Sequence, residues 1–92
     1  MKATRILVVS LTLAGLVGCS QAEITQCTTE PRSAWQDEEA FQQNLLDQGY
    51  RINEFKVTEG NCYEIYGFDP EQTKVEIYFN PVDGSIVKRE EN

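Results

Sequence analysis

The sequence predicts an α+β fold in which one helix packs on an antiparallel sheet of three or four strands. Apolar residues recur at helical spacing over residues 37–48 and then alternate with polar residues, as in strands, over most of residues 50–88. Turn-forming residues separate the alternating segments at distances typical of hairpins. Two cysteines, Cys27 and Cys62, can staple the segment before the helix to the sheet. A helix lying across one face of the sheet would bury the apolar side of both.

The first 18 residues have the features of an export signal. Lys2 and Arg5 supply positive charge, and an apolar run follows over residues 6–17. This run is shorter than the roughly 20 apolar residues of a membrane-spanning helix, and its length after a charged start is typical of a signal peptide. The alternative is a buried N-terminal helix. We interpret residues 1–18 as a lipoprotein signal peptide, residues 19–32 as a tether pinned at Cys27, and residues 33–92 as the folded domain.

The end of this signal resembles a bacterial lipobox, because residues 16–19 read Leu-Val-Gly-Cys. On this interpretation Cys19 becomes the first mature residue and the site of lipid attachment, and Ser20 after it favours the periplasmic face of the outer membrane. More than one acyl chain makes such an anchor stable. The alternative is ordinary signal cleavage after the small-x-small segment of residues 20–22, before Glu23, which would leave a soluble periplasmic protein.

The cysteine count supports export on either interpretation. Of three cysteines, Cys19 is either lipidated or removed, so Cys27 and Cys62 remain as a pair in an oxidising compartment. We predict a structural disulfide between them. The enclosed loop, 36 residues counted inclusively, corresponds to about 4 kcal/mol of stabilisation by loop-closure entropy. The alternative, two free thiols with a redox role, lacks a Cys-x-x-Cys motif.

The helix is predicted to begin after Asp37 and to end before Gly49. Asp37 can cap the first turn, the two glutamates after it suit the positive end of the helix dipole, and Gly49 supplies a left-handed stop. An earlier start, with Ser33 as the cap and Gln36 at the third position, is the alternative.

The helix should turn a short apolar stripe toward the sheet. Its expected members are Ala40, Phe41, Leu45 and Gln48. Trp35 precedes the cap, and we expect it to fold back onto Phe41 or Ala40 as a hydrophobic staple does.

Four strands are predicted after the helix. They are expected at residues 50–57, 62–68, 74–79 and 85–88. The first changes its alternation phase at residues 53–54, which indicates a bulge. Residues 59–61 and 81–84 form turns. Residues 69–72 have Pro70 in second place and suit a four-residue hairpin loop between the second and third strands.

The alternation also assigns the two faces of the sheet. The set expected to face the helix is Tyr63, Ile65, Val75, Ile77 and Phe79. The other, open face carries Glu64, Tyr66, Glu76 and Tyr78, and the hairpin loop places Tyr66 opposite Glu76 and Glu64 opposite Tyr78. Because aromatic residues are enriched at interface hot spots, we predict that these four form a partner-binding face. The alternative is an ordinary solvated sheet face.

Several segments, taken in order, resemble a small exported PepSY-domain protein. They are Cys27 to Pro31, Trp35, Gln48 to Tyr50, Gly60 to Tyr66, Val75 to Tyr78 and Asn80 to Val87. The resemblance covers about residues 27–88. It implies an α+β domain without known catalytic residues. Such modules occur in the propeptides of secreted metallopeptidases and as stand-alone exported proteins, and a role in restraining peptidase activity has been proposed for them.

Composition excludes several classes of function. The chain has 8 Lys and Arg against 15 Asp and Glu, a net charge of −7, and no histidine. An acidic chain without a basic patch is a poor nucleic-acid binder. Without histidine there is no Ser-His-Asp triad, Cys-His dyad or histidine metal site. We predict no catalytic residue, no cofactor and no metal site.

The sequence therefore predicts a non-catalytic periplasmic binding module, anchored through Cys19, that modulates or inhibits an exported peptidase or binds another envelope protein. One alternative is a small structural or cation-sensing envelope lipoprotein with no peptidase partner. In that case residues 69–71 or 83–85 would hold calcium, although both segments fit turns better. Another alternative is an enzyme with Glu64 and Glu76 as an acid–base pair. Exposed carboxylates keep near-normal pKa values, however, and a domain this small offers no deep pocket. The sequence identifies neither the partner nor the oligomeric state.

Overall fold

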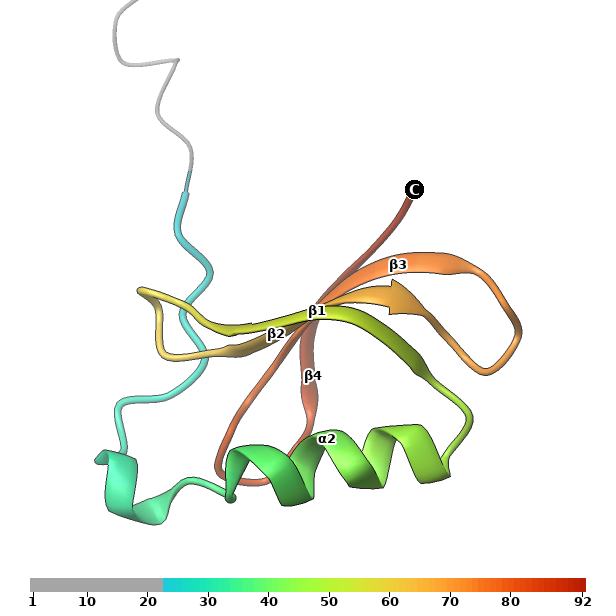
Figure 1. The fold of residues 1–92 in the computed structure, drawn as a ribbon. Coiled ribbons are helices and arrows are strands. Elements are labelled where there is room, and N and C mark those ends of the chain that lie inside the picture. The colour runs from blue at the N-terminus through green and yellow to red at the C-terminus, as the bar shows by residue number, and fades with distance from the viewer. Residues whose placement is uncertain (1–22) are drawn as a thin grey trace, which may run out of the picture.

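One helix lies across one face of a four-stranded antiparallel sheet (Figure 1), as the sequence predicts. The structure, a computed structural model, describes residues 23–92. The predictions about the signal peptide, the lipidation of Cys19 and the cleavage site at residues 20–22 lie outside the described residues. Within residues 23–92, no helix has the length and apolar character needed to cross a membrane.

The elements follow the chain in the order helix, then strands. They are the 3₁₀ turn η2 (Arg32–Ala34), the helix α2 (Glu38–Asp47), and the strands β1 (Arg51–Val57), β2 (Tyr63–Phe68), β3 (Lys74–Phe79) and β4 (Ile86–Glu91). The strands lie in the sheet in their order along the chain, β1-β2-β3-β4, and each pairs antiparallel with the next.

Local sequence signals set both ends of α2. The Asp37 carboxylate accepts a hydrogen bond from the backbone N–H of Ala40 at 3.0 Å, which confirms Asp37 as the cap. At the other end Gly49 has φ 104°, and the N–H groups of Gly49 and Tyr50 bond to the carbonyls of Leu46 and Leu45. This is the Schellman arrangement, which favours glycine at that position. The alternative start at Ser33 is wrong, because η2 is a separate turn.

The buried stripe of α2 is narrower than expected. Phe41 and Leu45 are buried, whereas Ala40 and Gln48, also assigned to the stripe, are exposed. The Phe41 ring packs against three aromatic rings of the sheet, those of Phe55, Tyr63 and Phe79. Two large side chains at i and i+4 therefore fill the space between helix and sheet.

The expectation for Trp35 is also corrected. Its ring packs edge-on against Tyr63, with the centroids 5.7 Å apart, rather than as a staple on the helix. Its Nε1–H donates to the backbone carbonyl of Glu30 at 3.1 Å. The Tyr63 hydroxyl donates to the carbonyl of Gln36, which holds the chain just before the helix over β2. A contact with the sheet thus replaces the local contact that the sequence suggested.

The core forms on the face that the alternation predicts. Its buried members are Phe41, Leu45, Tyr63, Ile65, Val75, Ile77 and Phe79. The bulge in β1 is confirmed between Ile52 and Glu54, and it lets Ile52, Phe55 and Val57 all pack against this core. Gly67 lies opposite Ile52, where an added Cβ would lie 1.9 Å from the carbonyl oxygen of Arg51, so the strands approach closely only because residue 67 is glycine.

The hairpin between β2 and β3 has the predicted loop. Its organising side chain is Asp69, which is 6% exposed. Oδ1 of Asp69 accepts from the N–H groups of Glu71 and Thr73, and Oδ2 binds Arg89 of β4 at 2.8 Å. Strand β4 runs to Glu91 and is longer than the predicted 85–88. All of its residues are exposed, so it lacks the apolar–polar alternation that marks a half-buried strand.

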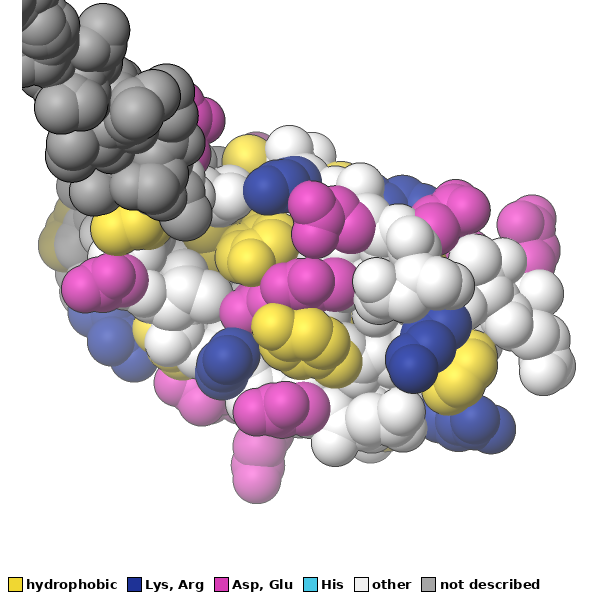
Figure 2. Space-filling view, turned by 90° about the horizontal axis from the view of Figure 1, so that it is seen from above, with side chains coloured by type: hydrophobic (Ala, Val, Ile, Leu, Met, Phe, Trp, Pro, Cys, Tyr) yellow, Lys and Arg dark blue, Asp and Glu magenta, His cyan; other side chains and the backbone are white. Residues whose placement is uncertain are grey.

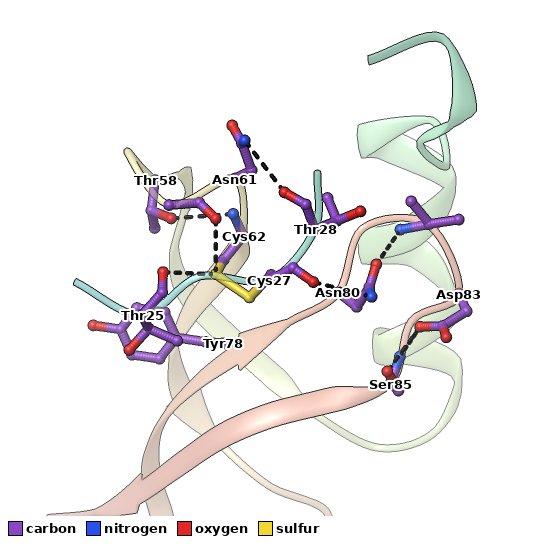
Figure 3. Close-up of a disulfide and its surroundings, with 12 residues drawn as sticks. Thr25, Cys27, Thr28, Thr58, Asn61, Cys62, Tyr78, Asn80, Asp83 and Ser85 are labelled. Carbon is purple, nitrogen blue, oxygen red and sulfur yellow. Dashed lines mark hydrogen bonds between the residues drawn. A yellow bond between two sulfur atoms is a disulfide. The ribbon is translucent and has the colours of Figure 1, made fainter. Parts of the chain in front are cut away.

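A disulfide between Cys27 and Cys62 fastens the N-terminal segment to the start of β2, with the two Cα atoms 5.1 Å apart (Figure 3). The predicted pairing is present. Three hydrogen bonds support it: from Cys27 N–H to the carbonyl of Gly60, from Asn61 to the carbonyl of Thr28, and from Asn80 to the carbonyl of Cys27. Residues 23–29 contain no helix or strand, yet they run beside the β1–β2 turn in a fixed position.

Removal of this disulfide should lower stability strongly. We expect Cys27→Ser to reduce the free energy of unfolding by about 2–4 kcal/mol, because the unfolded chain regains the freedom of a 36-residue loop. For a domain of this size that corresponds to a fall of more than about 10 °C in Tm. Thermal melts followed by circular dichroism, with the reduced wild-type protein as the matched control, measure it. An unchanged Tm in both would contradict a stabilising disulfide.

Candidate functional site

Two rows of side chains cross the face of the sheet opposite the helix. From β1 to β4 the first row is Lys56, Glu64, Tyr78 and Lys88, and the second is Glu54, Tyr66, Glu76 and Glu90. The register confirms that Glu64 lies opposite Tyr78 and Tyr66 opposite Glu76. Figure 2 shows this face, where carboxylates lie between hydrophobic or tyrosyl side chains. The four residues of the predicted partner-binding face, Glu64, Tyr66, Glu76 and Tyr78, are thus brought together; we call them the acid–tyrosine cluster.

Glu64 is not exposed, although the sequence analysis placed it on an open face. It is only 3% exposed, whereas Tyr66, Glu76 and Tyr78 are half-buried. Glu64 lies on the central strand β2, two residues after Cys62 and on the same face. The disulfide therefore brings the N-terminal segment to the end of the sheet where Glu64 lies.

Burial changes the protonation of the cluster. Desolvation, together with a hydrogen bond to Glu76, raises the pKa of Glu64 to about 7. The same hydrogen bond holds the pKa of Glu76 below its usual value, and the hydroxyls of Tyr66 and Tyr78 add to this effect. Between the lowered pKa of Glu76 and about pH 7, the two carboxyl groups thus hold one proton between them.

The same carboxylate of Glu76 holds one tyrosine of the cluster and affects the pKa of both. Tyr78 donates its hydroxyl to Oε2 of Glu76 at 3.0 Å. The hydrogen bond to Glu76 raises the pKa of Tyr66, and burial followed by the bond to Glu76 raises the pKa of Tyr78. Both phenols therefore stay neutral and act as donors. One atom lacks a partner: Oε2 of Glu64 is buried without a hydrogen bond.

A pocket of about 440 Å³ adjoins the cluster. It is lined by Glu23, Ile24, Thr25, Lys56, Val57, Thr58, Glu59, Glu64, Tyr78 and Lys88. The N-terminal segment forms one wall and all four strands contribute to the rest. The ammonium groups of Lys56 and Lys88 lie over the rings of Tyr66 and Tyr78, at 5.5 Å and 5.7 Å from the ring centroids.

The expectation of a near-normal pKa is wrong for Glu64, because burial raises its pKa to about 7. Glu64 and Glu76 lie diagonally on neighbouring strands, with Glu64 opposite Tyr78 and Glu76 opposite Tyr66. The carboxylate of Glu76 is engaged by the hydroxyl of Tyr78.

The turns considered for calcium use their carboxylates locally. Both oxygens of Asp69 are engaged, by two backbone N–H groups and by Arg89, and these bonds lower its pKa. Oδ1 of Asp83 accepts from the N–H and hydroxyl of Ser85. Over residues 23–92, no group of three or more Cys, Asp or Glu side chains is placed to hold a metal ion.

With this geometry in view, comparison with known proteins gives a family. The family described as "peptidase propeptide and YPEB domain" matches residues 5–90, nearly the whole chain. The chain belongs to the PepSY family. No curated protein and no solved structure matches it. Membership confirms the resemblance found in the sequence. PepSY domains are generally non-catalytic propeptide or regulatory modules, and they occur in extracellular or envelope proteins.

Neither the raised pKa of Glu64 beside Glu76 nor the pocket was predicted from the sequence. A signal for both was present in the sequence of the PepSY domain. Cys62 directly precedes β2 and Glu64 is the second residue of that strand, so the alternation of side chains predicts that a disulfide from Cys62 lies on the face that carries Glu64. The Cys27–Cys62 disulfide therefore also positions the N-terminal segment that lines the pocket beside Glu64.

The raised pKa of Glu64 predicts that the PepSY domain loses stability as the pH rises. The folded protein keeps a proton on Glu64 up to about pH 7, whereas the unfolded chain releases it near pH 4.3. The stabilisation is therefore fully present below about pH 4.3 and is lost as the pH rises through 7. We expect a free energy of unfolding lower at pH 8 than at pH 5, by on the order of 2 kcal/mol.

Urea unfolding across this pH range measures the effect. Glu64→Gln should flatten the dependence and be more stable than wild type at pH 8, because a neutral amide replaces a buried charge. Glu54→Gln, which removes an exposed carboxylate from the same face, is the matched control and should keep the wild-type slope. If Glu64→Gln keeps that slope too, Glu64 is not the titrating group.

Proposed function

We propose that this PepSY domain is a non-catalytic binding module that modulates an exported peptidase, and that the acid–tyrosine cluster is its contact surface. The observation that carries the proposal is a preformed polar and aromatic face in a domain of the peptidase-propeptide family. The helix covers the opposite face of the sheet, so the exposed part of β2 and β3 is the face with Tyr66, Glu76 and Tyr78.

The cluster is suited to binding because its side chains are already held in place. Glu76 accepts a hydrogen bond from Tyr78 at 3.0 Å, so this ring loses little freedom when a partner packs on it. Tyrosine is also among the residues that carry most binding energy in interfaces. A stand-alone module has no covalent link to a peptidase and gains no effective concentration from one, so it depends on such a preorganised surface.

We also propose that the domain works at the periplasmic face of the outer membrane, attached through a lipid on Cys19. The lipobox at residues 16–19 supports this proposal. A lipid anchor would confine the module to the membrane surface and raise its concentration near envelope partners. Ordinary cleavage before Glu23 would give the same domain in soluble form.

In-cell crosslinking followed by capture and mass spectrometry tests the partner. We expect an exported peptidase among the captured proteins, and we expect Tyr66→Ala to reduce its yield at least tenfold, because the variant removes a ring from the contact surface. Leu46→Ala is the matched control: Leu46 is 46% exposed on the helix, and its loss should leave capture unchanged.

A direct inhibition assay with the captured peptidase then measures regulation. Melting curves of both variants show whether the fold is retained. Capture of background envelope proteins alone, or equal loss in the two variants, would contradict the proposed contact surface.

Replacement of Cys19 tests the anchor. We expect Cys19→Ser to move the protein from the membrane fraction to the soluble fraction or to stop its processing, because serine has no thiol to carry the lipid. Immunoblots of separated fractions measure this, with Leu46→Ala as the control that keeps both the lipobox and the disulfide. A wild-type protein that is already soluble and begins at Glu23 would show that the lipobox interpretation is wrong.

A further inference from the structure

The pocket beside the acid–tyrosine cluster is built from parts of the chain that are distant in sequence. Glu23, Ile24 and Thr25 form one wall, and strands β1 to β4 supply the remainder. The wall is held in place by the Cys27–Cys62 disulfide and by close packing on Gly60, where an added Cβ would lie 1.8 Å from the carbonyl oxygen of Thr25. Figure 3 shows the segment with Thr25 and Cys27 passing this end of the sheet. The pocket therefore has a defined shape.

Glu64 brings an unused hydrogen-bond acceptor to this pocket. Its Oε2 is buried and has no partner, which is rare for a buried carboxyl oxygen. Glu64 also lines the pocket, so a hydrogen-bond donor that enters there can reach its carboxyl group. The terminal torsion of a glutamate is broad and roughly twofold, so either oxygen can turn toward a ligand at low cost.

The charges around Glu64 favour a cation. The groups that face it are Glu54 and Lys56 on β1, Tyr66 on β2, Glu76 and Tyr78 on β3, Lys88 and Glu90 on β4, and Glu23 and Glu59 on the adjoining segments. Neither lysine binds Glu64: Lys56 lies over Tyr66, and Lys88 lies over Tyr78 and pairs with Glu90 at 3.6 Å. The carboxylates outnumber the lysines, so the net charge of the site is negative.

The walls indicate the shape of that cation. Ile24 and Val57 line the pocket with aliphatic groups, and Ile24 is 56% exposed. Such walls suit a chain of methylene groups, and the acid at the base suits a compact group with several N–H donors. A lysine side chain has both parts, a flexible four-carbon stem and an ammonium group with three donors.

We propose that this pocket receives a lysine side chain of the protein that docks on the acid–tyrosine cluster, with the ammonium group bound to Glu64. The inference rests on the proposed function and names what its partner presents. Binding exchanges one cation for another: the proton of Glu64 leaves to water, and the lysine ammonium takes its place beside the Glu64 carboxylate. Affinity therefore rises with pH while the lysine remains protonated.

Titration of the protein with Nα-acetyl-lysine methylamide, followed by NMR shifts of the β2 amides, tests the pocket. We expect binding at pH 8 that weakens roughly thirtyfold at pH 5.5, because the ionised fraction of Glu64 falls about tenfold per pH unit below 7. Nα-acetyl-norleucine methylamide has the same stem without the ammonium group and should not bind. Glu64→Gln should abolish binding, and Glu54→Gln, which lies outside the pocket lining, should retain it.

Several results would overturn the inference. They are equal binding of the norleucine compound, an affinity that does not change with pH, and equal losses in Glu64→Gln and Glu54→Gln. The pH series on the wild-type protein decides the question if Glu64→Gln does not fold. Because the titration uses no partner protein, it tests the pocket separately from the proposed function. Capture of the partner by Glu64→Gln at wild-type yield would show that the partner supplies no lysine to this pocket.

Discussion

The disulfide between Cys27 and Cys62 is the constraint on which the arrangement of this domain depends. It fixes the N-terminal segment against the sheet at Cys62, the residue directly before β2. The next residue, Tyr63, points to the other face, where its ring meets those of Trp35 and Phe41 and its hydroxyl binds the chain before the helix. Glu64 then returns to the face of the staple. Three consecutive residues thus join the N-terminal segment, the helix and the candidate binding surface to one strand.

The cluster shows how a small acidic domain can bury a carboxyl group. A lone ionised carboxylate would be costly to desolvate. Here burial raises the pKa of Glu64 to about 7, so Glu64 keeps its proton, and the charge rests on Glu76, whose Oε2 accepts a hydrogen bond from the Tyr78 hydroxyl. The arrangement places one neutral buried acid beside one hydrogen-bonded carboxylate. It also leaves an acceptor atom of Glu64 unused, beside a pocket that reaches solvent.

The parts of the fold that local signals encode could be predicted from the sequence. Asp37 and Gly49 mark the helix ends, the phase change at residues 53–54 marks the bulge, and alternation in β2 and β3 assigns the core. The sequence-based predictions fail where contacts between residues distant in the chain, or the lack of a buried face, determine the structure. Trp35 packs on a strand residue 28 positions later in the chain rather than on the helix, and β4 has no buried face to reveal its length.

In the candidate site, too, one part could be predicted from local sequence signals and another part depends on a distant contact. Hairpin register places Tyr66 beside Glu76, and this is readable from the sequence. The pocket beside Glu64 is completed by the N-terminal segment, which the Cys27–Cys62 disulfide holds there across the fold.

The exposed strand β4 has a consequence for behaviour at high concentration. An open sheet with a bare edge strand offers unpaired N–H and C=O groups to another chain, and long flat apolar edges tend to join into aggregates. Residues 88–91 of β4 are four consecutive charged side chains, and the edge strand β1 carries Arg51, Glu54 and Lys56. To pair an edge strand with that of a neighbouring copy, each copy would have to remove these charged groups from water. Many copies can therefore crowd together without fibrous assembly, while the ordered face of the sheet stays accessible to a different protein.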